Sequence, residues 1–300
     1  MIINPQALRG IYVGFNTLFN KAFAEQTPIY QRVATVVPST TDAETYAWLG
    51  DIPGMREWIG DREVTNLSAS SYTIRNKDFE MTVAIPKNAV EDDKLGLYKP
   101  SIEMLGYSAA AHPDELTFDL LAAAFTAKCY DGKPFFSADH SIGRTKVSNM
   151  GTAPLTMEAY KAARASMMSL KNAAGKSLNL IPDLLVVPPT LEGAANDILI
   201  ADIINGTKNT MQGTAKVLVV PQLAGHDTAW YLLCTSRPLK PLIYQQRQAA
   251  KFVSKTDEKD DNVFMKKEFL YGADSRGNAG FGFWQMAYGS TGAGEDKASE

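Results

Sequence analysis

The stretch that most constrains the fold is a run of four apolar residues, LLVV at 184–187, that ends in Pro188 and Pro189. A strand with one solvated face alternates apolar and polar side chains, whereas a strand buried on both faces does not. Proline has no amide proton for the hydrogen-bond ladder of a sheet. We therefore expect a central strand at 184–187, followed by a helix that starts near Thr190 and packs back on the sheet.

The sequence around this run alternates between helix and strand patterns. In the helix expected at 191–205, apolar residues recur at helical spacing on one face, and Gly206 is placed to end it. Such alternation is typical of helices packed on a sheet and indicates a mixed unit over residues 155–235. Its expected elements are a helix at 156–170, a strand at 183–187, a helix at 191–205 and strands at 216–220 and 228–234.

The first 86 residues lack such alternation. Phe15, Leu18, Phe19 and Ala22 are spaced as on an amphipathic helix, and residues 24–45 show no sustained period. Apolar residues then alternate with polar ones at 72–74 and at 79–85, with the polar RNKD between the two runs. This pattern predicts a β-hairpin turning at 75–78, and its polar flank predicts that the hairpin projects from the body.

Residues 87–128 are predicted to be helical. The acidic run Glu91–Asp93 suits a helix N-terminus, where carboxylates meet the positive end of the helix dipole. Pro100 should kink or restart this helix, and Pro113 suits the first turn of a second helix, which should end before 130–136.

Extended patterns return at 237–290. We expect a charged loop at 255–262, an aromatic strand at 281–289 and a flexible tail at 291–300.

Composition excludes several classes of protein. The chain has 300 residues and a net charge of −3, which argues against a broad basic face for nucleic acid. Its N-terminus lacks the pattern of a cleaved secretory signal, and no apolar run approaches the ~20 residues of a membrane helix. Cys129 and Cys234 lie far apart without a CxxC or Cys/His motif, so we expect buried thiols and neither a disulfide nor a zinc site.

A nucleotide site is suggested by Gly175-Lys176-Ser177 but is not supported by its context. A phosphate-binding loop needs a glycine at position 170, where this chain has Leu170. The motif also follows a predicted helix and precedes a strand, which reverses the required order. We expect a polar turn here.

Histidine is the next candidate for chemistry. His112, His140 and His226 show none of the spacings of a metal or protease motif. His140 lies beside Asp139 and Ser141, but catalytic triads are assembled from distant segments, so a structural histidine is favoured. The acidic pairs at 92–93 and 260–261 are interpreted as a helix start and a charged loop. We therefore expect no catalytic, cofactor-binding or metal-binding residues.

One short segment mixes aromatic and basic residues. YQQRQAAKF at 244–252 could offer stacking surfaces to nucleic acid, although it lacks a surrounding basic field. A nucleic-acid-binding module and a virion-associated hydrolase centred on His140 are the two alternatives to a structural protein.

Several longer segments together resemble a known family, the major head subunit gpT of Mu-like bacteriophages and prophages. They occur in matching order and spacing along nearly the whole chain. The segments are YAWLGDIPGMREWIGDR (46–62), YTIRNKDFEMTV (72–83), EDDKLGLY (91–98), YDGKPFFSADH (130–140) and PDLLVVPPTLEGAA (182–195).

The resemblance implies an α+β fold of the Hong Kong 97 capsid type. Its parts would be an N-terminal arm, an extended E-loop hairpin, a peripheral domain with a long spine helix and an axial domain. The corresponding residues would be 1–45 for the arm, 46–86 for the E-loop region, 87–150 and 237–290 for the peripheral domain, 151–236 for the axial domain and 291–300 for the tail. Pro100 leaves the length of an unbroken spine helix open.

The resemblance also implies a function and partners. The chain would be a non-enzymatic major capsid protein that self-assembles into hexamers and pentamers of an icosahedral shell around double-stranded DNA, which it would contact without sequence specificity. Other partners would be a scaffold or protease, a portal and decoration proteins, with no cofactor and no membrane. Assembly would take place in the bacterial host cytoplasm. Some relatives crosslink their subunits, and Lys77 is a candidate donor, but the sequence identifies no acceptor. The arm and hairpin of such a subunit should be extended, mobile pieces that bury surface only on a neighbouring copy.

Overall fold

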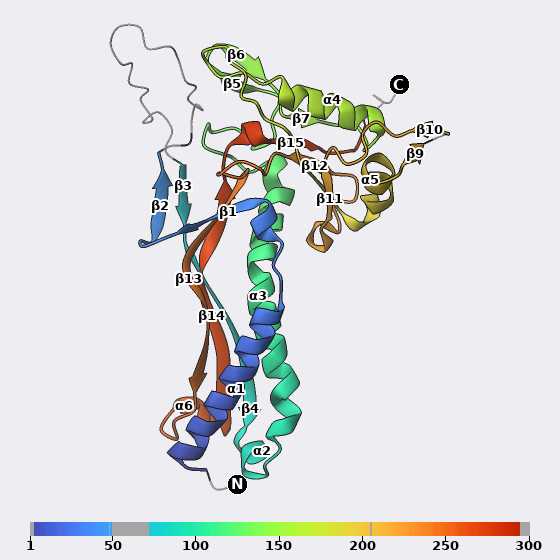
Figure 1. Cartoon of the computed structure of the whole chain (residues 1–300). Coiled ribbons are helices and arrows are strands. Elements are labelled where there is room, and N and C mark those ends of the chain that lie inside the picture. The colour runs from blue at the N-terminus through green and yellow to red at the C-terminus, as the bar shows by residue number, and fades with distance from the viewer. Residues whose placement is uncertain (1–2, 48, 50–71, 205, 295–300) are drawn as a thin grey trace, which may run out of the picture.

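A computed structural model describes residues 3–47, 49, 72–204 and 206–294. A long, narrow sheet with two helices along it forms one part, and a compact unit with a second sheet lies at one end of it (Figure 1).

The long sheet has the strand order β1-β13-β14-β4. Its two central strands, β13 (Leu242–Lys255) and β14 (Glu268–Phe281), form a long antiparallel pair. β4 (Lys77–Pro86) extends the sheet antiparallel to β14, and β1 (Ala34–Pro38) runs parallel to β13. Lys77 lies at the start of β4, paired with Gly277.

Two helices, α1 (Pro5–Glu25) and α3 (Lys99–Ala122), lie along this sheet. With 24 residues, α3 is about 36 Å long at 1.5 Å per residue. Phe15 and Phe19 of α1 pack in one apolar cluster with Ile102 and Leu105 of α3 and with Tyr271 of β14. The amphipathic helix predicted around Phe15 and Phe19 is thus confirmed, and its apolar face is covered within the same chain.

The second sheet has the order β11-β8-β12-β15-β7 and is mixed. β8 (Leu184–Val187) is buried along its whole length between β11 (Lys216–Val219) and β12 (Trp230–Leu233). Leu184 and Val186 face the core shared with α3, while Leu185 and Val187 face the core under α4 and α5. The prediction of a central strand buried on both faces is confirmed.

The remaining strands and helices are shorter. β7 (Met150–Gly151) and β15 (Ala287–Ser290) complete the second sheet, and α4 (Met157–Met168) and α5 (Glu192–Leu199) cover one of its faces. Three two-stranded sheets pair β2 (Ala43–Tyr46) with β3 (Tyr72–Arg75), β5 (His140–Ile142) with β6 (Thr145–Val147), and β9 (Ile203–Ile204) with β10 (Thr207–Lys208). The short helices are α2 (Lys87–Glu91), α6 (Asp261–Lys266), η1 (Tyr30–Arg32), η3 (Leu95–Tyr98), η4 (Ala123–Phe125), η5 (Pro189–Leu191), η6 (Pro221–Leu223) and η7 (Trp284–Met286).

The hairpin predicted to turn at 75–78 is wrong. β3 and β4 follow each other almost without a break, but β3 pairs with β2, whereas β4 pairs with β14. Alternation identified both strands correctly, because it reports the face of a strand and not its partner. Residues 50–71 of the predicted E-loop lie outside the described residues.

The expectation that the arm buries surface only on a neighbouring copy is also wrong for its described part. Tyr30, Val33 and Ala34 are buried in the core that includes Phe118 and Leu121 of α3, and β1 adds to the long sheet. Asp114 of α3 accepts hydrogen bonds from the amides of Ile29 (3.1 Å) and Tyr30 (2.6 Å). Burial raises the pKa of Asp114 above its ordinary value, although these two amide donors act in the opposite direction. Residues 26–42 of the arm show no period because they form only a 3-10 turn and one edge strand, which are too short to show one.

Within 87–128 the helix boundaries differ from prediction. Pro100 does restart a helix, since α3 begins at Lys99 and proline is tolerated in the first turn. Asp92 and Asp93, however, follow the end of α2, where Asp93 adopts a positive φ of 57°. Pro113 lies inside α3, so the second helix predicted to start there is a continuation of the first.

The helix predicted at 191–205 is shorter than expected. α5 ends at Leu199, and Ile203 belongs to β9. Thr190 caps no helix: its hydroxyl donates instead to the carbonyl of Asp227 at 2.9 Å. Gly206 has a positive φ of 77°, but it lies in the turn between β9 and β10 and not at the end of the helix.

Three expectations for the C-terminal part also change. The aromatic segment 281–289 begins as the last residue of β14, continues through η7 and becomes a strand only at Ala287. β15 belongs to the second sheet, which therefore recruits strands from beyond the predicted axial segment 151–236. In the predicted tail, the Gly294 amide donates to the carbonyl of Thr152 at 2.8 Å, and residues 295–300 lie outside the described residues. The domain boundaries themselves stay predictions.

Candidate functional site

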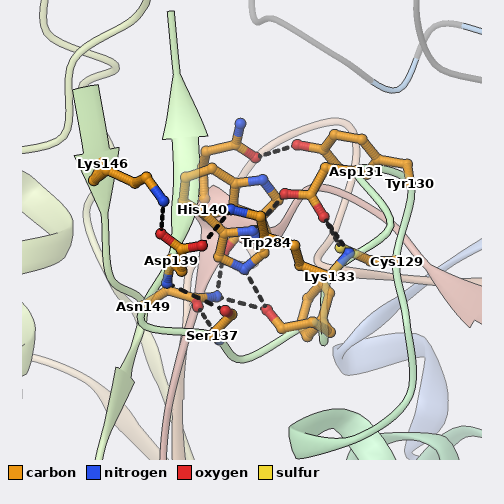
Figure 2. A network of polar contacts seen from close by, with 12 residues as sticks. Cys129, Tyr130, Asp131, Lys133, Ser137, Asp139, His140, Lys146, Asn149 and Trp284 are labelled. Atoms are coloured by element: carbon orange, nitrogen blue, oxygen red, sulfur yellow. Dashed lines mark hydrogen bonds and ion pairs between the residues drawn. The ribbon is translucent and has the colours of Figure 1, made fainter. Parts of the chain in front are cut away.

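Polar side chains gather in the loop that joins α3 to β5 and β6 (Figure 2). The loop begins after η4 ends at Phe125 and turns at Gly132, which takes a positive φ of 79°. It folds back on itself through an isolated bridge between Lys128 and Pro134. These turns bring Cys129, Asp131 and His140 together.

His140 is fully buried at the centre of this network. Its ring lies parallel to Trp284 of η7, with an interplanar angle of 4° and 4.1 Å between ring centroids. Nδ1 lies 2.6 Å from Oδ2 of Asp131, and Nε2 lies 3.1 Å from the carbonyl oxygen of Phe135. Both partners are acceptors, so the ring satisfies both only when each of its nitrogens carries a proton.

Asp131 links His140 to Cys129. Its Oδ1 accepts a hydrogen bond from the Cys129 thiol at 3.2 Å and another from the Lys133 amide at 3.0 Å. Burial raises the pKa of Asp131, but hydrogen bonds from His140, Lys133 and Cys129 outweigh it and leave the pKa below its ordinary value. Burial raises the pKa of the Cys129 thiol to about 12, so the thiol stays protonated near neutral pH.

These residue types are those of a cysteine protease triad, but their connections are different. In a triad the carboxylate holds one ring nitrogen and the nucleophile faces the other. Here the second nitrogen is bound to a backbone carbonyl, and the thiol is bound to the carboxylate. His140 has 0% side-chain exposure, so a substrate could not reach the ring. The ring therefore ties Asp131 to the Phe135 carbonyl within the loop.

Two neighbours hold the same loop in place. Asn149 donates to the carbonyls of Phe135, Trp284 and Ala287 at 2.9 to 3.2 Å, and its Oδ1 accepts from the Ser137 amide at 2.9 Å. Asp139 accepts from Lys146 and, at 3.0 Å, from Lys133. These two lysines lower the pKa of Asp139 to about 2.

The polar turn at Gly175-Lys176-Ser177 is confirmed. Gly175 has a φ of 76°, and its amide donates to the carbonyl of Asn172 at 2.9 Å. The Asn172 side chain accepts from the amides of Ala174 and Lys176 at 3.1 and 3.0 Å. The amides that a phosphate would need are thus already bound within the turn.

The aromatic residues of 244–252 do not form a nucleic-acid platform. Tyr244 packs on Tyr30 with ring centroids 4.8 Å apart, and Phe252 packs on Phe19 at 5.4 Å. Both rings are buried, so neither offers a face on which a base could stack.

The other candidate residues lie apart from the network. His112 is on α3, 3.3 Å from Glu115 and stacked edge-on against Phe79, and His226 is exposed after η6. Asp260 and Asp261 mark the start of α6, a helix that the sequence did not reveal.

A second buried network lies where β2 and β3 meet the long sheet, and sequence reasoning missed it. Gln245 of β13 is fully buried and accepts a hydrogen bond from the Tyr46 hydroxyl at 2.9 Å. Its amide donates to Asn76 at 2.8 Å and to the carbonyl of Ile74 at 3.1 Å, and Asn76 in turn donates to Ser39 at 2.8 Å. The network fixes both ends of the β2–β3 pair, and a buried Gln next to polar residues gave no periodic signal.

Comparison with known proteins connects these features to one family. The family model of the Mu-like prophage major head subunit gpT matches residues 8–154, 150–223 and 222–298. This chain belongs to that family. It is 36% identical over 286 residues to the Mu-like prophage FluMu major head subunit of Haemophilus influenzae, with 95% of this chain and 73% of that protein covered. It is 33% identical over 287 residues to the major capsid protein of Escherichia phage Mu, with 96% and 74% covered.

The fold of this chain is also similar to that of a subunit in a solved phage procapsid. A subunit from the procapsid of bacteriophage JBD30 superposes with a TM-score of 0.62 at 36% identity, with 96% of this chain and 76% of that chain covered. The predicted α+β capsid fold of the Hong Kong 97 type is therefore confirmed.

Membership also decides between the classes of function. Mu-like head subunits are structural capsid proteins and not enzymes, so this chain is a major capsid protein of a phage head. The hydrolase alternative centred on His140 is excluded by its family and by the connections of the ring. Among the described residues, no helix is long and apolar enough to cross a membrane.

Proposed function

We propose that this head subunit self-assembles into hexamers and pentamers that close into an icosahedral shell around double-stranded phage DNA. The observation that carries the proposal is the match to a procapsid subunit over 96% of the chain. A shell subunit must bury part of its surface on neighbouring copies, so it should carry apolar side chains that its own fold leaves uncovered.

Such side chains occur at the far ends of the molecule. Phe264 and Met265 of α6 are 81% and 76% exposed, at the end of the long sheet remote from the second sheet (Figure 1). Ile203 of β9 is 67% exposed at the outer end of the compact unit. Their positions at opposite ends suit a subunit that meets neighbours on more than one side.

The charge of the subunit suits the same role. With a net charge of −3, the chain lacks the excess of basic residues that gives strong binding to phosphates. A wall that held DNA tightly would obstruct its packaging and release. We infer contact with DNA without sequence specificity, assembly in the cytoplasm of the bacterial host, and further contacts with a scaffold or protease, a portal and decoration proteins.

The test is electron microscopy of the purified full chain, expressed alone and together with a scaffold protein from the same phage. We expect closed shells, or rings of five and six subunits, in at least one of these conditions. A chain that stays monomeric in both would contradict the proposal. A nucleic-acid-binding module would instead show strong binding to DNA whose affinity falls steeply with salt.

A further inference from the structure

The loop network contains three side chains whose donor atoms suit a transition metal. Sγ of Cys129, a carboxylate oxygen of Asp131 and a ring nitrogen of His140 all lie within 4.8 Å of one another. Thiolate, imidazole and carboxylate are the ligands that Zn²⁺ uses in proteins. We propose that Cys129, Asp131 and His140 form a zinc site that fastens the loop between α3 and β5.

The orientation of His140 fits the role of a ligand. A metal-bound histidine usually donates its other ring N–H to a carbonyl or carboxylate, which fixes the ring and its tautomer. Here Nε2 lies 3.1 Å from the carbonyl of Phe135, and Trp284 holds the plane of the ring. Nδ1 is thereby directed to the side on which Asp131 and Cys129 lie (Figure 2).

The spacing of the donor atoms is close to that of a tetrahedral site. Zinc bonds of roughly 2.0–2.3 Å at tetrahedral angles place ligand atoms about 3.3–3.6 Å apart. The thiol and Oδ1 of Asp131 are 3.2 Å apart, and Nδ1 of His140 and Oδ2 are 2.6 Å apart. Both pairs must therefore open for zinc to enter between them, each by less than ~1 Å.

Access to the site comes through Asp131. Its side chain is 23% exposed, whereas that of His140 is 0% exposed and Cys129 is buried. A zinc ion can therefore reach the cluster from the side of Asp131, and a water molecule can complete the tetrahedral shell there.

Binding is an exchange of protons for the metal. The S–H bond of Cys129 and the N–H bond at Nδ1 of His140 break, and Zn–S and Zn–N bonds form with both electron pairs supplied by the ligands. The two protons leave to solvent, and the carboxylate of Asp131 adds the third bond. No change of oxidation state occurs.

The experiment uses Co²⁺ as a spectroscopic substitute for Zn²⁺ on the chelator-treated full chain. We expect one equivalent of Co²⁺ to produce a near-ultraviolet thiolate-to-cobalt absorption band, and one equivalent of Zn²⁺ to remove it. Zn²⁺ should also raise the thermal midpoint of unfolding. A wild-type chain without such a band would overturn the proposal.

The matched variants are Cys129→Ser and Cys234→Ser. Cys234 is the second buried cysteine, and its Sγ lies 3.9 Å from the hydroxyl oxygen of Ser236. The band and the Zn²⁺-dependent shift should be lost in Cys129→Ser and kept in Cys234→Ser, and the opposite pattern would refute the site. If Cys129→Ser does not fold, X-ray absorption of the cobalt-loaded wild type decides: one sulfur ligand supports the proposal, and a shell of only nitrogen and oxygen overturns it.

Discussion

At the scale of single residues, buried polar side chains hold together segments that are distant in the sequence. Asn149 connects the loop after α3 to η7 and β15 through four hydrogen bonds, and Gln245 connects β13 to the base of β2–β3. A buried polar group that loses its partners keeps the full cost of its removal from water. The stability of the head subunit should therefore depend strongly on a few such residues.

Replacing Asn149 with alanine tests this dependence. The change leaves buried carbonyls of Phe135, Trp284 and Ala287 and the amide of Ser137 without their partner, so we expect a loss of about 2–3 kcal/mol in the free energy of unfolding. Urea denaturation followed by circular dichroism measures it. Asn20→Ala, at an exposed position on α1, should change the free energy by less than about 0.5 kcal/mol. Equal effects of the two variants would refute the role given to Asn149.

The carboxylate of Glu44 on β2 should stabilise the folded subunit, and this stabilisation should be lost in acid. Its carboxylate accepts from the Thr40 amide at 2.8 Å, the Ser39 hydroxyl at 2.9 Å and the Thr41 amide at 3.2 Å. These hydrogen bonds, that from Thr40 first, lower its pKa from 4.5 to about 2. Because the pKa is lower in the folded state, the stabilisation is complete above about pH 4.5 and is lost as the pH falls toward 2.

The measurement is the thermal midpoint of unfolding as a function of pH. Between about pH 5 and about pH 3 the midpoint of the wild type should fall more steeply than that of Glu44→Gln, which has no carboxylate to protonate at this position. Glu103→Gln, an exposed change on α3, should retain the wild-type slope. Parallel curves for Glu44→Gln and the wild type would contradict the prediction.

At the scale of elements, α3 carries two prolines in different positions. Pro100 lies in the first turn, where no amide proton is required, whereas Pro113 lies in the interior and supplies no proton to the carbonyl four residues back. Proline should therefore destabilise α3 only slightly at position 100 and considerably at position 113.

Alanine substitutions should separate these costs. We expect Pro113→Ala to raise the free energy of unfolding by about 1–3 kcal/mol, because it restores a helical hydrogen bond. Pro100→Ala should change it by less than about 0.5 kcal/mol. Chemical denaturation of both variants provides the comparison, and a stabilisation by Pro100→Ala as large as that by Pro113→Ala would argue against this explanation.

The contact between α1 and α3 depends on a glycine at their crossing. A Cβ atom at Gly106 would lie 2.4 Å from the carbonyl oxygen of Phe19 on α1. Gly106→Ala should force the helices apart and destabilise the subunit by about 1–3 kcal/mol. Gly14 of α1 has no atom within 4 Å of the position a Cβ would take, so Gly14→Ala should stabilise by up to about 1 kcal/mol. Thermal and urea unfolding of the pair would reveal the opposite signs, and a shared sign would contradict the packing described here.

At the scale of the whole molecule, the subunit is long and leaves apolar groups uncovered at its ends. Phe264 and Met265 on α6 add little to the stability of one subunit, since both are more than three-quarters exposed. Burying such side chains on a neighbouring copy would stabilise an assembly by roughly 1.5–3 kcal/mol each.

The double variant Phe264→Ser/Met265→Ser tests this assignment. We expect the thermal midpoint of the unassembled subunit to stay within about 2 °C of the wild type, because exposed side chains contribute little to folding. The yield of shells seen by electron microscopy should fall markedly. Lys266→Ser, a polar change on the same helix, should assemble as the wild type does. Normal shells from the double variant would show that α6 lies outside the interfaces.

Local sequence patterns predicted correctly those elements whose structure depends on residues close together in the chain. The helix around Phe15 and Phe19, the strand Leu184–Val187 and the turn at Gly175 all follow from side-chain spacing, proline position and glycine conformation within a few residues. The resemblance of longer segments to Mu-like head subunits also identified the family and the capsid fold correctly. The local elements depend on neighbouring residues, and the family assignment depends on sequence similarity, so neither requires the tertiary structure.

The tertiary structure decided everything that depends on partners far along the chain. β3 and β4 alternate as predicted, yet β4 pairs with β14, about 190 residues later, because the pleat defines a face and not a neighbour. Cys129, Asp131 and His140 meet only because the loop turns back on itself, which linear spacing does not reveal. The sequence by itself thus determined the local states of the main elements and the family. Strand pairing, the covering of the arm and the buried polar networks required the fold, since these contacts arise only when distant segments are brought together.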